Sequence, residues 1–520
     1  MKSLISNRWV RIHAVATALV FVYSTAGWAE TYYVDSIDGD DANSGLAESS
    51  AWKSLEKVNG WTFNPGDRIL FRAGASWTGQ LWPKGSGTES SPIIVDRYGA
   101  DAFPHIDGAG KVSEVVYLYN QSFWEINNLE ITNDAPEPGD RRGVLIKAEN
   151  YGIMRHIYLK HLYIHNIKGI IGQSIKAKVT GGIGFWEAAD DVKDTRFDDI
   201  LVDSCTIHTV DNTGLYTIGA RGGRANDPSS PDWYRRRITN LHIRNNVIHD
   251  VAKNAMIIRM ADGGVVEYNV CYNTAYRTGT GNTIFSRSCD GTVFQYNEGY
   301  LNRTKAHDGC LYDADLNSPN TVWQYSYSHD NNHGLIWFCT VKTDSGVIVR
   351  YNISQNDKGR LIALRYDFAG ADIYNNVFFI PSWLSPVIIH EKPGRTQKYG
   401  FYNNIIYNMS PTARYEFANA DRTIDYNVFY GYHPDGEPDD PHKITADPRF
   451  VAPGTARLGI HTTGGYKLLP DSPCIDSGKA IENNGGKDFF GNPLYAGKPD
   501  RGVHERPRNR FGYLGVARHN

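Results

Sequence analysis

The chain has 520 residues, 21% of them charged, and its 54 basic and 57 acidic side chains leave a net charge of −3. This balance supplies no basic surface for a nucleic acid partner, while the length allows a large buried core. Aromatic residues make up 12% of the chain, with 32 Tyr and 12 Trp, and such flat rings often contribute to sites that bind sugars.

The first 29 residues have the features of an export signal. Three basic residues precede the apolar run AVATALVFVYSTAG, and Gly27 and Ala29 supply small residues before a cleavage point ahead of Glu30. The apolar run is too short to favour a membrane span. We therefore expect a secreted or periplasmic protein with no membrane span; the alternative is an uncleaved anchor with the same external destination.

The six cysteines form no CxxC pair, so a zinc ribbon is not expected. Export permits disulfides, but four of the six lie in strand-like stretches, where buried free thiols are equally compatible with the sequence. The cysteines are Cys205, Cys271, Cys289, Cys310, Cys339 and Cys474. The sequence leaves both states open.

A short box recurs through the middle of the chain. Clear copies are EYNVCYN at 267–273, QYNEGYL at 295–301, RYNISQN at 350–356 and DYNVFYG at 425–431. The box tyrosines are 23 to 29 residues apart, at Tyr268, Tyr296, Tyr325, Tyr351, Tyr374, Tyr402 and Tyr426. Short apolar alternations between Asn, Gly and Asp turns at this period predict a solenoid of strands, and the amphipathic runs that helical repeats need are missing.

The asparagine of the box has two expected roles. It tolerates left-handed backbone at the corner between two strands, and copies on successive coils can form hydrogen bonds in a ladder. Together these features predict an all-β chain that folds as a right-handed parallel β-helix, with three short strands per coil. The alternative is an all-β sandwich in which the self-similarity is accidental.

The two ends of the chain resemble those of a known family. The opening TYYVDSIDGDDANSG…AWKSLEKVN…FNPGDRILFRAGASWTGQL and the closing YKLLPDSPCIDSGKAI…DFFGNP…PDRGVHE are similar to the corresponding segments of secreted right-handed β-helix proteins of the pectate-lyase-like superfamily. The resemblance covers about residues 31–506 and implies a short helix over AWKSLEKVN. It implies action on polysaccharides but not the reaction, because lyases, hydrolases, epimerases and adhesins share this scaffold.

An open β-helix exposes unpaired strand edges at both ends, and these must be covered. We expect residues 30–110 to form an N-terminal cap and the first coils, and residues 111–431 to form the β-helix. The irregular segment 432–520 is expected to fold back over the other end. The chain is then one elongated, monomeric domain.

The stretch HDGCLYDADL, residues 307–316, carries two aspartates two positions apart. In a β-strand Asp313 and Asp315 share one face with Leu311, their Cβ atoms roughly 6.5–7 Å apart, while Cys310 faces the other side. Like charges at that distance disfavour each other. The pair is therefore our first candidate for a catalytic site.

Neighbouring coils can be aligned by the glycines that precede their strands, at Gly281, Gly309, Gly334 and Gly359. The alignment predicts two columns of side chains across coils that are about 4.8 Å apart. One column contains Arg287, Asp315, Thr340 and Arg365, and the other contains Phe285, Asp313, Phe338 and Ala363. Arg287 would then stand beside Asp315 and keep its carboxylate ionised. Arg259 joins a column only after a shift of one residue.

The turns before these strands are equally polar. NRTKAHDG supplies Lys305, His307 and Asp308, and SHDNNHG supplies His329, Asp330 and His333. Because the turns of a solenoid stack, we expect both clusters at one edge of the same face. Titratable groups of mixed sign that converge in this way indicate a functional site more often than a single carboxylate does.

Two further segments are candidates for the walls of a groove across the coils from about 183 to 392. GIGFWEAADD supplies Trp186 and Glu187, and the long loop GARGGRANDPSSPDWYRRR supplies Arg221, Arg224 and Trp233. Loops of that length on a solenoid commonly build the binding groove. Trp233, in a polar loop, is our candidate for stacking on a sugar.

Hydrolysis of a glycosidic bond is the leading interpretation, since it needs one protonated carboxyl and one ionised carboxylate and no cofactor. Arg287 would hold Asp315 ionised and leave Asp313 or Asp308 as the acid. The candidate catalytic residues are Asp313, Asp315, Asp308, His307, Lys305 and Arg287. The candidate substrate-binding residues are Arg259, His329, Asp330, His333, Glu187, Trp233 and Arg365. The basic residues on this face favour an acidic polysaccharide.

Two other interpretations stay open. Asp313, Asp315 and Asp330 could bind Ca²⁺, which prefers carboxylate oxygens and would neutralise a uronate while Lys305, Arg287 or Arg259 removes the C5 proton in a lyase reaction. Alternatively, the chain is a surface or glycan-binding protein without catalysis, in which case these acids form solvated salt bridges on a flat face.

Overall fold

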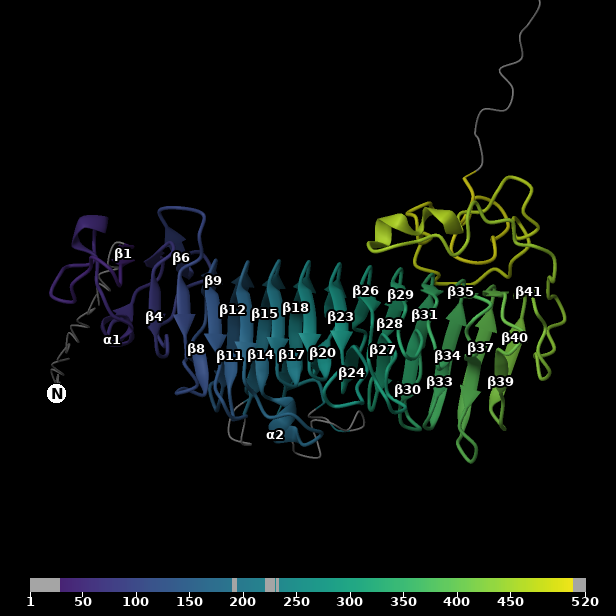
Figure 1. Cartoon of the computed structure of the whole chain (residues 1–520), viewed down its shortest axis with the longest axis horizontal. Helices are drawn as coiled ribbons and strands as arrows, with labels where there is room; N and C mark the ends of the chain where they lie inside the picture. Colours follow the sequence, from purple (N-terminus) through teal and green to yellow (C-terminus); the bar gives the residue numbers. More distant parts are fainter. Residues whose placement is uncertain (1–28, 189–193, 220–229, 231–232, 508–520) are drawn as a thin grey trace, which may run out of the picture.

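The structure is a computed structural model that describes residues 29–188, 194–219, 230 and 233–507 (Figure 1). The expected export signal, except Ala29, therefore lies outside the described residues, as do Arg221 and Arg224. The chain is a right-handed parallel β-helix in which each coil gives one strand to each of three parallel sheets. This confirms the predicted fold class.

The first sheet has 15 strands. In spatial order they are β1 (Thr31–Val34), β3 (Arg68–Arg72), β6 (Ile93–Tyr98), β9 (Trp124–Asn127), β12 (Ile153–Lys160), β15 (Arg196–Asp203), β18 (Ile238–Arg244), β22 (Val265–Glu267), β25 (Val293–Gln295), β28 (Val322–Gln324), β31 (Val347–Arg350), β34 (Phe368–Tyr374), β37 (Gln397–Tyr402) and β40 (Asp421–Asp425), with β21 (Ala261–Asp262) paired to β18.

The second sheet has 13 strands. They are β4 (Ser76–Thr78), β7 (His105–Asp107), β10 (Glu130–Asn133), β13 (Tyr163–Ile167), β16 (Thr206–Val210), β19 (Val247–Val251), β23 (Val270–Thr274), β26 (Glu298–Tyr300), β29 (Tyr327–His329), β32 (Ile353–Gln355), β35 (Val377–Ile380), β38 (Ile405–Asn408) and β41 (Val428–Gly431).

The third sheet has 11 strands and carries the candidate site. They are β8 (Glu114–Tyr119), β11 (Arg142–Ala148), β14 (Gly181–Glu187), β17 (Thr213–Ile218), β20 (Asn254–Arg259), β24 (Ile284–Arg287), β27 (Tyr312–Asp315), β30 (Ile336–Cys339), β33 (Arg360–Leu364), β36 (Val387–Glu391) and β39 (Arg414–Glu416). The remaining elements are β2 (Thr62–Phe63), β5 (Lys84–Gly85), α1 (Leu55–Asn59), α2 (Ile175–Lys178) and the short 3-10 helices 48–50 and 460–466.

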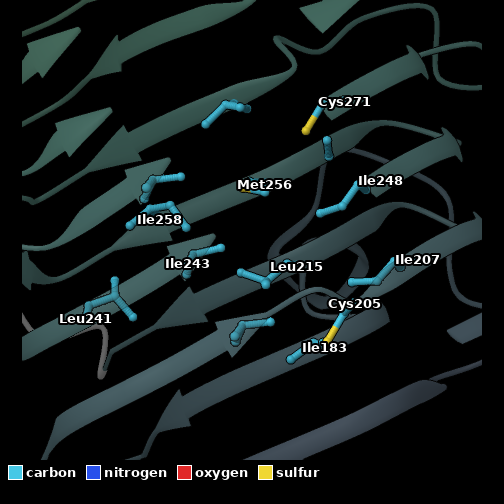
Figure 2. Close-up of a cluster of buried hydrophobic side chains, with 14 of the residues drawn as sticks. Ile183, Cys205, Ile207, Leu215, Leu241, Ile243, Ile248, Met256, Ile258 and Cys271 are labelled. Atoms are coloured by element: carbon cyan, nitrogen blue, oxygen red, sulfur yellow. The ribbon is translucent and has the colours of Figure 1, made fainter. Parts of the chain in front are cut away.

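Apolar side chains from all three sheets point inward and fill the β-helix. Figure 2 shows a part of this core in which Leu215 and Met256 of the third sheet lie near Ile243 of the first and Ile248 of the second. Because strand side chains alternate between the two faces of a sheet, every coil adds one apolar layer inside and one set of side chains outside. The outer side chains do not belong to this core and can therefore form a functional site.

The predicted asparagine ladder is present. Amide side chains bond from coil to coil with N···O distances of 2.9 to 3.1 Å, through Asn246, Asn269 and Asn297 and again through Asn352, Asn376, Asn404 and Asn427. Ser326 replaces the asparagine between these two runs. The ladder asparagines do not adopt the left-handed conformation themselves, so that part of the prediction is wrong: the preceding residue does, for example Tyr268 (φ 55°) or Asn375 (φ 54°).

The two ends of the chain only partly follow expectation. The N-terminal helix forms over Leu55–Asn59, where the Ser54 hydroxyl accepts from the Lys57 backbone N–H at 3.1 Å. The C-terminal segment bridges the last coil at Val428 and Ile444. Most of it, however, lies along the side of the β-helix rather than over the end, above β26 to β41 in Figure 1.

Side-chain contacts fix this lateral position. The Gln355 amide donates to the Ala456 carbonyl at 3.0 Å, and the Asn375 amide donates to the Asp500 carbonyl at 3.0 Å. All six cysteines are free thiols, and only Cys339 is partly exposed. No helix among the described residues is long and apolar enough to cross a membrane.

Candidate active site

β27 places both aspartates on the outer face of the third sheet. Tyr312 and Ala314 pack in the interior core, so strand alternation directs Asp313 and Asp315 outward. This confirms that the pair shares a face. The two residues before the strand differ from expectation: Leu311 is in the core and Cys310 lies outside, because the strand begins only at Tyr312.

On the side of β24, the predicted register is right. Phe285 pairs with Asp313, and a guanidinium nitrogen of Arg287 lies 3.3 Å from a carboxylate oxygen of Asp315. Arg259 pairs with Arg287 in the same column, without the shift that the glycine alignment required. Arg259, Arg287 and Asp315 therefore occupy one column on three successive coils.

On the side of β30, the predicted register is wrong by one residue. Trp337 stands beside Asp313 and Cys339 beside Asp315, where the alignment placed Phe338 and Thr340. The cause is the turn: Ile336, the partner of Tyr312, follows Gly334 by two residues, whereas Tyr312 follows Gly309 by three. The next coil returns to the expected register, with Ala363 beside Trp337.

Asp313 is buried in surroundings that favour its protonated form. It is 8% exposed, and one carboxyl oxygen accepts from the Asn282 amide at 2.7 Å. Burial, together with the negative charges of Asp315 and Asp308, raises the pKa of Asp313 well above its usual value. The other oxygen has no hydrogen-bond partner in the described part of the chain.

Asp315 has the opposite surroundings. One oxygen contacts Arg287, and the other accepts from the Leu316 backbone N–H at 2.8 Å. A guanidinium and a backbone donor both stabilise a carboxylate anion. The strand therefore carries, as next outward neighbours, one carboxyl whose surroundings favour its protonated form and one that is ion-paired with Arg287.

Lys178 and Asn282 complete the site, and sequence reasoning missed both. α2 and Val179 cover Tyr216 and Phe285 on the outer face, which brings the Lys178 ammonium within 5.6 Å of the Phe285 ring centroid. Burial and the charges of the neighbouring arginines lower the pKa of Lys178, while the two aspartates oppose that change. No repeat pattern marks Lys178, because it comes from a loop several coils earlier.

The turn between β26 and β27 brings three predicted residues to the edge of the site. Lys305 and His307 are exposed, and Asp308 is half-buried, where it accepts from the Thr280 hydroxyl at 3.2 Å. The His307 ring lies 6.1 Å from the Trp337 ring. Asp308 is thus the most open of the three carboxyls.

His333 stabilises this turn through two hydrogen bonds. Its Nδ1 accepts from the Arg360 backbone N–H at 3.0 Å, and its Nε2 lies 2.9 Å from the Ala306 carbonyl, to which it donates. Burial lowers the pKa of His333, in keeping with a neutral ring. The imidazole ties the turn that carries His307 and Asp308 to the next coil.

His329 and Asp330 are not part of the site, which corrects the expectation that both histidine clusters share one edge. His329 is 3% exposed on the second sheet, between Asp330 at 2.8 Å and Glu298 at 3.2 Å. Burial disfavours its charge, but the hydrogen bonds to these carboxylates prevail and raise its pKa to about 9. With Arg457 and its neighbours, His329 and Asp330 line a separate cavity of about 510 Å³.

The expected calcium ligands Asp313, Asp315 and Asp330 are therefore not brought together. Among the described residues, no group of three or more His, Cys, Asp or Glu side chains is placed to hold a metal ion.

The expected groove walls are placed as follows. Trp186 lines a cavity of about 320 Å³ with Ile218, beside α2, and Glu187 is buried at the end of β14. Trp233 is 1% exposed, and the Arg237 guanidinium lies 3.2 Å from the centroid of its ring. With its ring covered, Trp233 has no open face for a sugar, so we leave it out of the site.

No family model matches the chain. The chain is 30% identical to lacto-N-biosidase from Bifidobacterium longum subsp. longum over 598 aligned positions, which cover 93% of this chain and 37% of that protein. It therefore spans little more than a third of the length of that relative.

Solved structures show the same architecture. GH136 lacto-N-biosidase from Eubacterium ramulus superposes with a TM-score of 0.63 at 25% identity, over 76% of this chain and 67% of that one. XylC in complex with xylose superposes with a TM-score of 0.52 at 12% identity, over 92% and 99% of the two chains, which shows the fold alone. The chain thus shares its parallel β-helix fold with GH136 lacto-N-biosidase and with XylC.

Proposed function

We propose that the chain is a glycoside hydrolase that acts outside the cytoplasm, as a monomer and without a cofactor, on glycans related to those of a lacto-N-biosidase. One observation carries the proposal: β27 presents two carboxyls with unequal surroundings on one outer face, the buried Asp313 and the Asp315 that is ion-paired with Arg287. The similarity to lacto-N-biosidase over 93% of the chain supports hydrolysis rather than elimination.

The geometry supports an assignment of both groups that hydrolysis needs. A carboxyl must give a proton to the glycosidic oxygen, and a carboxylate must activate water or attack the anomeric carbon. Asp315, held by Arg287, serves as the carboxylate. Asp313, whose surroundings favour its protonated form, serves as the acid; Asp308 is the alternative acid because it is more open to a substrate. Unequal surroundings that separate two carboxyls in this way are typical of acid and base pairs.

The test is a panel of neutral and acidic oligosaccharides together with an aryl lacto-N-bioside. A hydrolase releases reducing ends, produces no unsaturated product and keeps its activity in EDTA. Asp315→Asn and Asp313→Asn should each lower kcat/KM by about 10²- to 10⁴-fold, the usual contribution of a positioned acid or base.

Asp421→Asn is the matched control, because Asp421 is an exposed aspartate of β40 in the first sheet. Asp308→Asn decides between the two acids, since loss of activity in this variant with retention in Asp313→Asn assigns the proton to Asp308. Wild-type rates in all three site variants would show that the carboxyls of this turn and strand are not catalytic.

A further inference from the structure

A group of basic side chains lies on the outer face of the third sheet beyond Trp337. Arg360, Arg365 and His390, here called the basic patch, surround Ala363. The backbone register runs from Asp313 through Trp337 and Ala363 to His390 on successive coils. At about 4.8 Å per coil, Ala363 lies roughly 10 Å from the position of Asp313.

The basic patch has too few counter-charges. Within the described residues, neither Arg360 nor Arg365 makes an ion pair; Glu416 is the carboxylate that faces the patch, and it already pairs with Arg414 at 2.9 Å. His390 Nε2 lies 3.7 Å from Glu416. Arg360, Arg365 and Arg414 therefore lie near a single carboxylate, and an anion bound between the two unpaired guanidiniums of Arg360 and Arg365 would offset their mutual repulsion.

An unsatisfied donor, the Arg360 Nε, points to the same conclusion. The Arg360 Nε and the Nδ1 of His390 are buried without a hydrogen-bond partner in the part of the chain that the structure describes, and His390 is only 6% exposed. Burial and the positive charge of Arg365 lower the pKa of Arg360. Burial and the charge of Arg360 lower the pKa of His390 to about 4, so its ring is neutral and leaves the cationic role to the arginines.

The two arginines lie beside the candidate active site. The backbone N–H of Arg360 donates to His333 at 3.0 Å, and the Arg365 guanidinium lies 5.2 Å from the centroid of the Trp337 ring. Trp337 is in turn the neighbour of Asp313. A glycan bound at Asp313 that continues toward β33 would pass directly over these guanidiniums.

We propose that Arg360 and Arg365 bind an anionic group of the glycan, a carboxylate or a sulfate ester, on a sugar close to the bond that is cleaved. Guanidinium groups bind such planar or multi-oxygen anions through paired hydrogen bonds. This inference rests on the proposed function and deepens it, because it identifies the substrate class as acidic oligosaccharides.

The test compares one oligosaccharide in neutral, carboxylated and sulfated forms. Wild-type protein should show a higher kcat/KM on an anionic form, and 0.5 M NaCl should reduce the preference. The variant Arg360→Gln/Arg365→Gln should lose at least tenfold more kcat/KM on that form than on the neutral one, mainly through KM. The anion with the larger loss identifies which of the two groups binds.

Two other variants keep the experiment decisive. Arg360→Lys/Arg365→Lys retains the charges and should keep part of the preference even if the glutamine variant folds poorly. Arg395→Gln is the matched control, because Arg395 is exposed and lies 3.5 Å from Asp367; it should not change the preference.

The outcomes separate the two proposals. Equal cleavage of all three forms, with no selective effect of the glutamine variant, overturns the anion site but not the hydrolase. If no form is cleaved, the proposed function fails. Calorimetric titration of Asp315→Asn with the carboxylated and sulfated oligosaccharides then tests the basic patch alone, and binding that does not depend on Arg360 and Arg365 overturns it.

Discussion

The amide of Asn282 sets how readily Asp313 gives up its proton. It donates to the carboxyl at 2.7 Å, while its own oxygen accepts from the Cys310 backbone N–H at 2.9 Å, which fixes its orientation. A donor to the carboxylate favours the ionised form. Asn282→Leu should therefore raise the pKa of Asp313 further, and the alkaline limb of the kcat/KM profile should move to higher pH.

The charge of Asp308 acts in the opposite direction, because it raises the pKa of Asp313. If Asp313 is the acid, Asp308→Asn stays active and moves the alkaline limb to lower pH. The two variants should thus move the alkaline limb in opposite directions if Asp313 is the acid. An alkaline limb that does not move in Asn282→Leu would contradict proton donation by Asp313.

The asparagine ladder is the element that fixes the register of the coils. Asn352 is fully buried; it accepts from the Ser326 backbone N–H at 2.9 Å and donates to the Trp323 carbonyl at 2.9 Å and to Asn376 at 3.0 Å. Asn352→Leu leaves these groups unsatisfied, at a cost of about 1–3 kcal/mol for each buried group.

Urea denaturation should therefore show a loss of about 3 kcal/mol or more in the free energy of unfolding for Asn352→Leu. Asn419→Leu is the control, because Asn419 is exposed and surface substitutions usually change stability by less than about 0.5 kcal/mol. A loss below about 1 kcal/mol in Asn352→Leu would mean that water replaces the ladder bonds.

The same elements explain how far the sequence predicts the structure. The repeat predicts the coils, the ladder and the shared face of Asp313 and Asp315, because these depend on local period and alternation. It does not predict the short turn after Gly334, which moves Trp337 next to Asp313. The repeat also does not predict the position of Lys178, which packs against residues several coils away, because no local sequence pattern reflects such a contact.

At the scale of the whole molecule, the C-terminal segment leaves the candidate site open. The Arg350 guanidinium at the end of a first-sheet strand donates to the Asn483 carbonyl at 2.7 Å, and Glu298 of the second sheet accepts from the Gly459 N–H at 2.8 Å. In Figure 1 the segment lies above the strands and α2 below them. The C-terminal segment thus attaches to the first and second sheets, and α2, not this segment, covers part of the outer face of the third sheet.

Buried carboxyls make the attachment of the C-terminal segment depend on pH. Burial raises the pKa of Asp500 to about 6 and that of Glu505 to about 7. Because these values exceed the ordinary ones of free carboxyls, the two groups stabilise the folded segment fully at about pH 4, and this contribution is lost as pH rises through 6 to 7. His504 acts oppositely: burial lowers its pKa to about 4, so its contribution is lost as pH falls below about 6.5.

Burial also raises the pKa of Asp488 in this segment, so three carboxyls oppose one imidazole and should leave a net weakening toward alkaline pH. Limited proteolysis within residues 432–507 should therefore be faster at pH 8 than at pH 5, after correction for protease activity on an unfolded substrate. His504→Asn retains an acceptor for the Leu468 N–H, which His504 binds at 3.0 Å, and removes the opposing titration, so the difference between the two pH values should grow. Equal cleavage rates at both pH values in this variant would mean that Asp500 and Glu505 keep the same protonation when the segment detaches, and that the segment is held by its apolar contacts with the β-helix.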